Sequence, residues 1–147
     1  MINYRKLQQP ELTEIARLDA ISNRSPWSLF DYQQSELNPA HYLIGMYREG
    51  EIIGCCLYSM VAGEAEILQF FIRYELQHQG YGKQLLQHIL ATLDAEDIEQ
   101  TFLEVMVGNT PAINLYHQLG FNIIGNRKNY YHVDGKKIDA LMMARQR

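Results

Sequence analysis

An apolar run, a loop with two glycines and an amphipathic segment follow one another in the middle of the chain. The run is Ile67–Ile72, the loop is Gln77–Gly82, and the segment after it carries Leu85, Leu86, Ile89, Leu90 and Leu93. This order predicts a strand, a tight turn and a helix over about residues 80–94. The first amides of a helix lack partners within the helix and attract anions. We therefore expect an anionic group, such as a cofactor phosphate, at this helix start.

The loop alone leaves alternatives open. Leu85 stands where the third glycine of a Gly-x-Gly-x-x-Gly dinucleotide loop would lie. A P-loop is also excluded, because the upstream glycine is absent and Gln84, not Ser or Thr, follows Lys83. A plain turn that only starts a helix and binds nothing fits these residues equally well.

Length and composition favour one globular domain covering residues 1–147. Of the 147 residues, 47% are apolar and 20% charged, as in ordinary soluble domains. No apolar run approaches the roughly 18 residues of a membrane span, and Met1–Lys6 lacks the apolar part of a signal peptide. We expect a cytoplasmic protein, a monomer or weak dimer, without membrane contact. The net charge of −4 argues against direct nucleic-acid binding, which usually needs a basic stripe.

The cysteines and histidines indicate no metal site. Cys55 and Cys56 are adjacent and are the only cysteines, so they form neither a disulfide framework nor a thiolate cluster. We expect both to be buried thiols in a strand. The histidines show no ligand spacing; they are His41, His78, His88, His117 and His132.

Hydrophobic periodicity predicts the order β-α-α-β-β-β-α-β-α-β-β. Consecutive strands that later alternate with helices indicate a mixed sheet with helices on both faces, hence an α/β or α+β fold. We expect strands at Ile2–Leu7, Tyr42–Arg48, Glu51–Met60, Glu64–Ile72, Thr101–Val107, Asn122–Arg127 and Lys136–Ala144, and further helices at Pro10–Ser22, Ser28–Leu37 and Thr110–Leu119.

Glu104 interrupts an apolar strand. Alternation places Phe102, Glu104 and Met106 on one face of that strand. A carboxylate there is costly to bury unless it is paired or has a chemical role, such as that of a general base. The other interpretation is a carboxylate that meets solvent or an arginine.

The segment Asn109–Phe121 has the signals of a capped helix. Asn109 can cap it, Pro111 suits its first turn, and Gly120 suits a left-handed C-terminal cap. Tyr116 lies on the apolar stripe of this helix. It is either a core tyrosine with a satisfied hydroxyl or a functional group.

Taken together, these features resemble the GCN5-related N-acetyltransferase superfamily over about residues 44–143. Gln77-x-x-Gly80-x-Gly82 matches the acetyl-CoA pyrophosphate loop of that family, and the pattern Asn109-x-x-Ala112-x-x-x-Tyr116-x-x-x-Gly120-Phe121 matches its later cofactor and catalytic motif. The resemblance implies a mixed, mostly antiparallel central sheet of about six or seven strands, with about four helices distributed over both faces.

A closer resemblance is to the bacterial ribosomal-protein alanine N-acetyltransferases, which acetylate the amino-terminal alanine of the eighteenth small-subunit ribosomal protein. It rests on segments such as Pro26-Trp27-Ser28, Leu103-Glu104-Val105 and Arg127–Tyr131. It implies Glu104 as general base, Tyr116 as general acid, and a peptide amino terminus as acceptor. The chain departs from this group at Met106, Gly108, Phe71, His78 and Gln79.

The resemblance also implies the binding residues. Amides of Phe71 or Ile72 would face the developing oxyanion, and Asn109 would contact the pantetheine arm of acetyl-CoA. Tyr130 and Tyr131, expected in a loop, would either bind the acceptor or cover the sheet, and Trp27 would either fill the core or touch the peptide. The full cofactor set is Phe71, Ile72, Gln77, His78, Gln79, Gly80, Tyr81, Gly82, Lys83, Asn109 and Ala112.

Two other functions fit the same motifs. One is acetylation of a small-molecule amine by an enzyme of the same fold. The other is a non-catalytic acyl-CoA-binding module, in which the bulky Phe71 would block the thioester site.

Overall fold

The structure is a computed structural model that describes residues 1–147. Seven strands form one sheet in the order β1-β2-β3-β4-β5-β7-β6, and all neighbours are antiparallel except β4 and β5. This confirms the predicted element order and the mixed, mostly antiparallel sheet. The strands are β1 Ile2–Lys6, β2 His41–Arg48, β3 Glu51–Val61, β4 Glu64–Ile72, β5 Gln100–Met106, β6 Phe121–Val133 and β7 Lys136–Gln146; the helices are α1 Leu12–Ser22, α2 Leu29–Glu36, α3 Tyr81–Ala95 and α4 Thr110–Gln118, with short 3-10 turns at Gln9–Glu11 and Tyr74–Leu76.

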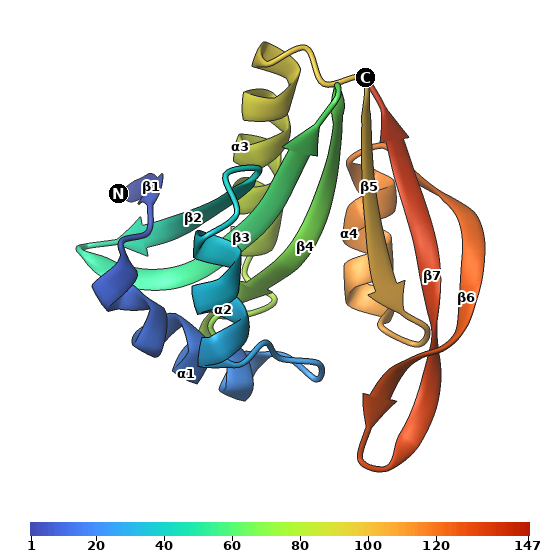
Figure 1. Cartoon of the computed structure of the whole chain (residues 1–147), viewed down its shortest axis with the longest axis horizontal. Coiled ribbons are helices and arrows are strands. Elements are labelled where there is room, and N and C mark those ends of the chain that lie inside the picture. Colours follow the sequence, from blue (N-terminus) through green and yellow to red (C-terminus); the bar gives the residue numbers. More distant parts are fainter.

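Helices cover both faces of the sheet, as predicted. Helices α1 and α2 lie on one face, and α3 and α4 lie on the other (Figure 1). Each face has its own buried cluster, the larger one under α3 and the smaller one under α1 and α2. Cys55 belongs to the smaller cluster and Cys56 to the larger, because successive side chains of a strand point to opposite faces. Both thiols are buried and free, as expected.

Strands β4 and β5 pair only at their starts. The parallel ladder joins Glu64–Ile67 to Gln100–Leu103 and ends there. Beyond it the two strands diverge along their length (Figure 1). Residues 68–72 of β4 and 104–106 of β5 therefore face a gap in the sheet.

A β-bulge in β4 changes which side chains face that gap. Tyr58 of β3 pairs with Ile67, but the preceding residue Leu57 pairs with Gln69, so Leu68 is an extra residue. An extra residue reverses the alternation of a strand. Ile67 consequently packs in the cluster under α3, whereas Gln69 shares the α1 and α2 face with Leu57.

One predicted boundary was wrong. Strand β6 continues to Val133, so Tyr130 and Tyr131 lie in a strand and not in a loop. The cause is a second bulge, where pairing passes from Arg127 and Ala140 to Tyr131 and Ile138. Asn129 in this bulge has a φ of 56°, and its amide donates to Asp139 Oδ1 at 2.9 Å. The bulge accommodates Asn129, whose conformation is typical of a turn, without ending the strand.

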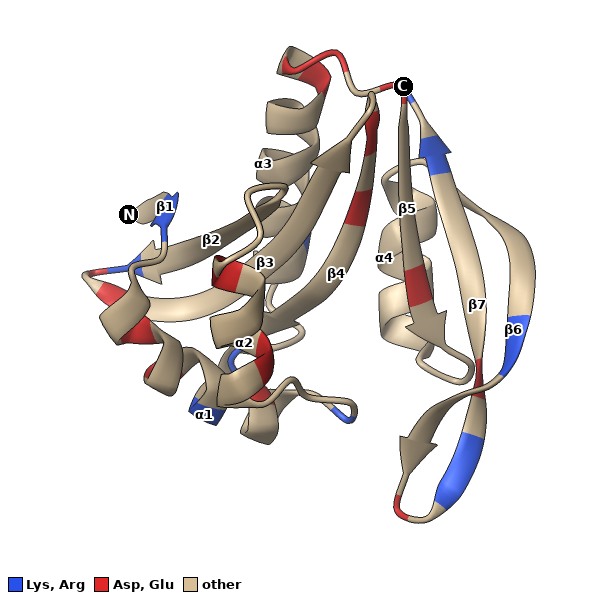
Figure 2. Ribbon diagram, in the orientation of Figure 1, with Lys and Arg blue, Asp and Glu red and all other residues tan.

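Charged residues are distributed over the whole fold. Lys and Arg appear in short separate stretches, and acidic residues lie on β4 and β5 (Figure 2). Arg145 of β7 donates two hydrogen bonds of 3.0 Å to Asp94 at the end of α3, which ties the second half of the sheet to this helix. No helix has the length and apolar character needed to cross a membrane.

We predict that Gly54→Ala destabilises the fold close to the gap. A Cβ at Gly54 would lie 2.7 Å from the carbonyl oxygen of Phe71 and 2.7 Å from Ile72 Cδ1, so β3 and β4 would have to separate. Such overpacking costs roughly 1–3 kcal/mol of unfolding free energy, measurable by urea denaturation. Gly125→Ala is the matched control, because its Cβ would meet only the side chain of Met142, with Sδ at 3.6 Å and Cβ at 4.0 Å. Equal stability of the two variants would contradict the prediction.

Candidate active site

A cavity of about 1090 Å³ opens where β4 and β5 diverge. Its walls are residues 66–72 of β4 and 103–106 of β5, the start of α3, one side of α4 and the tyrosine pair of β6. Both motifs that the sequence singled out therefore reach one cavity. Glu104 and Tyr116 both line it, although one comes from strand β5 and the other from helix α4.

The glycine loop places the first amides of α3 at this cavity. Gly80 has a φ of 90°, a left-handed conformation that a glycine adopts readily, and it forms the N-cap. The first helical hydrogen bond runs from the Gln84 amide to the Gly80 carbonyl at 3.2 Å. The amides of Tyr81, Gly82 and Lys83 precede that bond and have no partner in the helix. Free amides at a helix start are suited to an anion.

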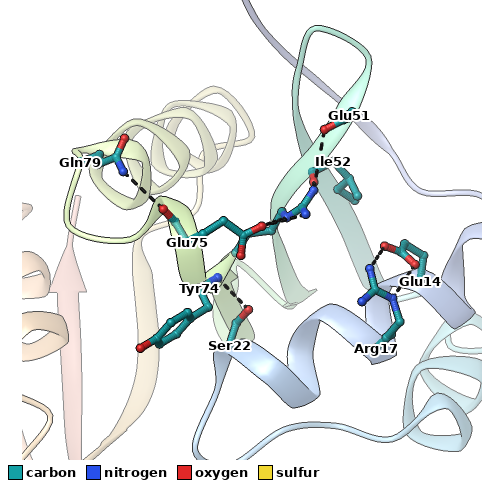
Figure 3. A network of polar contacts seen from close by, with 9 residues as sticks. Glu14, Arg17, Ser22, Glu51, Ile52, Tyr74, Glu75 and Gln79 are labelled. Atoms are coloured by element: carbon teal, nitrogen blue, oxygen red, sulfur yellow. Dashed lines mark hydrogen bonds and ion pairs between the residues drawn. The ribbon is translucent and has the colours of Figure 1, made fainter.

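Most of the predicted cofactor residues line the cavity, but two side chains do not. Gln79 extends back to the Glu75 carbonyl at 3.4 Å (Figure 3). The hydroxyl of Tyr81 accepts a hydrogen bond of 2.6 Å from Arg48 on β2. The residues that do line it are Phe71, Ile72, Gln77, His78, Gly80, Gly82, Lys83, Asn109 and Ala112.

Gln77 connects the loop to the end of α1. Its side-chain nitrogen donates to the carbonyls of Ile72 at 2.9 Å and Ser22 at 3.2 Å. The Ser22 hydroxyl in turn accepts from the Tyr74 amide at 3.1 Å (Figure 3). The side chain of Gln77 thus holds the wall of the cavity in place.

Glu104 contacts an arginine through one carboxylate oxygen and leaves the other without a partner. Its Oε1 lies 3.5 Å from Nη1 of Arg127, a half-exposed side chain. Its Oε2 is buried and has no hydrogen-bond partner. A buried acceptor without a donor is unfavourable, so this oxygen marks a place where a ligand or a water can donate a hydrogen.

Titratable groups gather around Glu104. Burial, followed by the charge of Glu104, raises the pKa of Glu66 on the neighbouring strand. Burial also raises the pKa of Tyr130, again with a contribution from Glu104, and it raises the pKa of Tyr131 to about 12. Both phenols are therefore neutral near pH 7. The Arg127 guanidinium lies 5.2 Å from the centre of the Tyr130 ring.

Tyr116 packs like a core tyrosine but leaves its hydroxyl free. It is 7% exposed and makes edge contacts with the rings of Phe70 and Phe121. Its hydroxyl makes no hydrogen bond within the chain, while the residue lines the cavity. Burial raises the pKa of Tyr116, which keeps the phenol protonated near neutral pH.

Trp27 and Phe71 both belong to the core under α1 and α2. Trp27 lines the cavity and also packs against that core, with its ring 5.5 Å from the ring of Tyr32. Phe71 is only 3% exposed and is a member of the same cluster. The bulk of Phe71 therefore fills the core and leaves the cavity open.

Two polar residues of this region, Asp19 and Gln69, were not predicted from the sequence. Asp19 is completely buried, and Gln69 donates to its carboxylate from β4 at 2.9 Å. A signal for Asp19 exists in the sequence, because it lies four residues after Ile15 and seven after Leu12 on the apolar stripe of α1. Gln69 has no such signal, because the bulge decides on which face of the sheet its side chain lies.

The sheet opens after the parallel pairing of β4 and β5, and the cavity there brings together the start of α3, a carboxylate and a phenol. The family model described as Acetyltransferase (GNAT) family matches residues 7–121. The chain therefore belongs to the GNAT acetyltransferase family, and it is an N-acetyltransferase. This confirms the resemblance found in the sequence.

Known relatives agree with this assignment. A Bacillus subtilis protein provisionally named ribosomal protein bS18-alanine N-acetyltransferase is 33% identical, with 95% of this chain and 91% of the relative aligned. The Escherichia coli K12 ribosomal protein bS18-alanine N-acetyltransferase is 30% identical over 94% of this chain and 93% of its own. The crystal structure of the E. coli ribosomal-protein-S18-alanine N-acetyltransferase superposes with a TM-score of 0.93 at 26% identity, covering 99% of this chain and 94% of that chain.

Proposed function

We propose that residues 1–147 act as one cytoplasmic domain that transfers an acetyl group from acetyl-CoA to the amino-terminal α-amine of a protein. The proposed acceptor is the amino-terminal alanine of ribosomal protein bS18, and transfer is direct, within a ternary complex. The names of the relatives support the acceptor. The observation that carries the mechanism is the buried, unpartnered Oε2 of Glu104 in the cavity that Tyr116 shares.

The residues at the helix start fit acetyl-CoA, which supplies the thioester. The free amides of residues 81–83 and the charge of Lys83 suit its pyrophosphate. Asn109 uses its Oδ1 to cap the Ala112 amide at 3.4 Å, while its side-chain nitrogen makes no bond within the chain and is available to the pantetheine arm. The residues beyond the last β4–β5 pair have no strand beside them in the gap, so an amide of Phe71 or Ile72 is our candidate donor to the oxyanion.

Glu104 accepts the proton of the attacking amine. An α-amine has a pKa of about 7.7–8.0, so a carboxylate can deprotonate it near pH 7, directly or through a water. Arg127 holds Oε1 and leaves Oε2 for this step. Tyr116, protonated because burial raises its pKa, donates a proton to the departing thiolate.

The acceptor is tested by incubating the protein and acetyl-CoA with peptides that begin Ala-Arg, with the same peptides carrying other first residues, and with polyamines. Mass spectrometry identifies the product, and a thiol reagent measures release of coenzyme A. We expect acetylation at the amino terminus of the Ala-Arg peptide. Acetylation of the polyamines alone would overturn the peptide assignment in favour of a small-molecule amine. Absence of thiol release with every amine would overturn the catalytic proposal.

We predict that Glu104→Gln lowers turnover at pH 7 by roughly 10²-fold or more, because an amide cannot take the proton. The affinity for acetyl-CoA, measured by calorimetry, should stay within about twofold. The deficit should shrink toward pH 9, where most of the amine is already deprotonated. The control is Glu64→Gln, an exposed residue of β4 outside the cavity. Unchanged turnover in Glu104→Gln would exclude Glu104 as the base.

We predict that Tyr116→Phe slows transfer by roughly 10²–10⁴-fold without a matching loss of stability, because only the donor hydroxyl is removed. Single-turnover kinetics and urea denaturation measure the two effects. Tyr58→Phe is the control, since Tyr58 is a buried tyrosine of β3 that does not line the cavity. Wild-type rates in Tyr116→Phe would show that this residue serves the core alone.

A further inference from the structure

We propose that Gln69 binds the acceptor through its side-chain carbonyl oxygen and that Asp19 is the positioning residue that orients it. The inference rests on the proposed function and adds a residue to it. The ligand group is an N–H of the acceptor, either on its α-amine or on its first peptide bond.

The bulge of β4 directs Gln69 to this place. In a regular strand Gln69, two residues after Ile67, would lie on the same face as Ile67 and point into the core under α3. With the extra residue Leu68, Gln69 lies on the α1 and α2 face and lines the cavity. Bulges of this kind commonly redirect a side chain beside an active site.

The neighbours of Gln69 fix the orientation of its amide. The nitrogen Nε2 faces the carboxylate oxygen Oδ2 of Asp19 at 2.9 Å and the backbone carbonyl of Ser25 at 3.3 Å. Both partners only accept hydrogens, so the NH₂ end must face them and both of its hydrogens are used. The carbonyl Oε1 makes no hydrogen bond within the chain and is not enclosed. It remains as an acceptor for a ligand in the cavity.

Asp19 is a rigid anchor for this arrangement. Its carboxylate is fully buried, and besides Gln69 it accepts hydrogen bonds from Asn23 Nδ2 at 2.6 Å, the Trp27 amide at 3.0 Å and the Tyr32 hydroxyl at 2.5 Å. Withdrawing a donor from a buried carboxylate costs much free energy. The hydrogen bond to Asp19 therefore holds the Gln69 side chain in this rotamer. The anchor also fixes the segment Ser22–Trp27, which forms the adjacent wall of the cavity.

Gln69 and Glu104 border the same end of the gap. The last parallel pair joins Ile67 to Leu103. Gln69 follows that pair on β4, and Glu104 follows it on β5. Ile67 and Leu103 point into the core under α3, and the neighbouring Glu104 points to the opposite face, which is also the face of Gln69. After Glu104 has taken one proton, the neutral amine still carries N–H groups, and a carbonyl oxygen on the other strand can hold one of them.

The test is Gln69→Leu, which removes the carbonyl but keeps a similar volume. We expect the KM for the acceptor to rise roughly 10-fold, while the KM for acetyl-CoA stays within about twofold. The matched control is Gln87→Leu, the same change on the exposed surface of α3. An unchanged acceptor KM in Gln69→Leu would overturn the inference.

The role of Asp19 is tested with Asp19→Asn and the double variant. Asp19→Asn should raise the acceptor KM as Gln69→Leu does, and the double variant should raise it no further, because both changes act through one amide. Additive effects on KM would overturn the positioning role. If Asp19→Asn does not fold by urea denaturation, Gln69→Leu alone decides the inference.

Measurements on the wild-type enzyme distinguish a failure of this inference from a failure of the proposed function. Each KM is measured with whichever amine the wild-type enzyme acetylates best. A wild type that acetylates the Ala-Arg peptide, combined with an unaffected Gln69→Leu, overturns the inference alone. A wild type that acetylates no amine overturns both.

Discussion

The site depends on the short parallel pairing of β4 and β5. Four residue pairs hold the two strands together, and the ladder then ends at Ile67 and Leu103. Beyond this pair the two strands contribute different groups to the gap. Strand β4 provides backbone groups without a partner on this side and the side chain of Gln69, while β5 provides Glu104. If the pairing continued, the backbone groups would form hydrogen bonds within the sheet, and the side chains would have no gap beside them. The divergence therefore leaves a cavity in the middle of the sheet.

Polar anchors behind the cavity keep the gap in shape. Asp19 accepts hydrogen bonds from the segment after α1, from α2 and from β4, and Gln77 links the loop before α3 to the end of α1. These two residues hold the segment Ser22–Trp27 from both sides. Arg145 and Asp94 tie β7 to α3 on the opposite face. A site with few flexible supports is suited to a reaction that requires an amine, a thioester and a base in fixed positions.

Much of this organisation could be predicted from the sequence, because local signals specified it. The glycine loop, the capped helix after Asn109 and the apolar strand around Glu104 each carry a pattern that depends on near neighbours. The resemblance to the acetyltransferases rested on the same residues, and the family match and relatives confirmed it. Whether Glu104 meets an arginine or a ligand could not be decided from alternation. It depends on Arg127, which a bulged strand brings from elsewhere in the chain.

The parts that the sequence left undetermined are those set by bulges. One bulge turned the expected loop around Tyr130 and Tyr131 into strand, and the other directed Gln69 toward Asp19. A bulge has no strong composition signal, yet a single extra residue reverses every side chain beyond it. Asp19 had a visible signal on the stripe of α1, but its donors come from segments as distant as β4.

We expect the amine to react in the β4–β5 gap with Glu104 as its base. A crystal structure with a bisubstrate analogue, in which coenzyme A is joined to the amino terminus of an Ala-Arg peptide, would test this. The acceptor nitrogen should lie within hydrogen-bond distance of Glu104 Oε2, or one water away, with the pyrophosphate at the start of α3. An acceptor nitrogen outside the gap, with Glu104 bound only to Arg127, would contradict it.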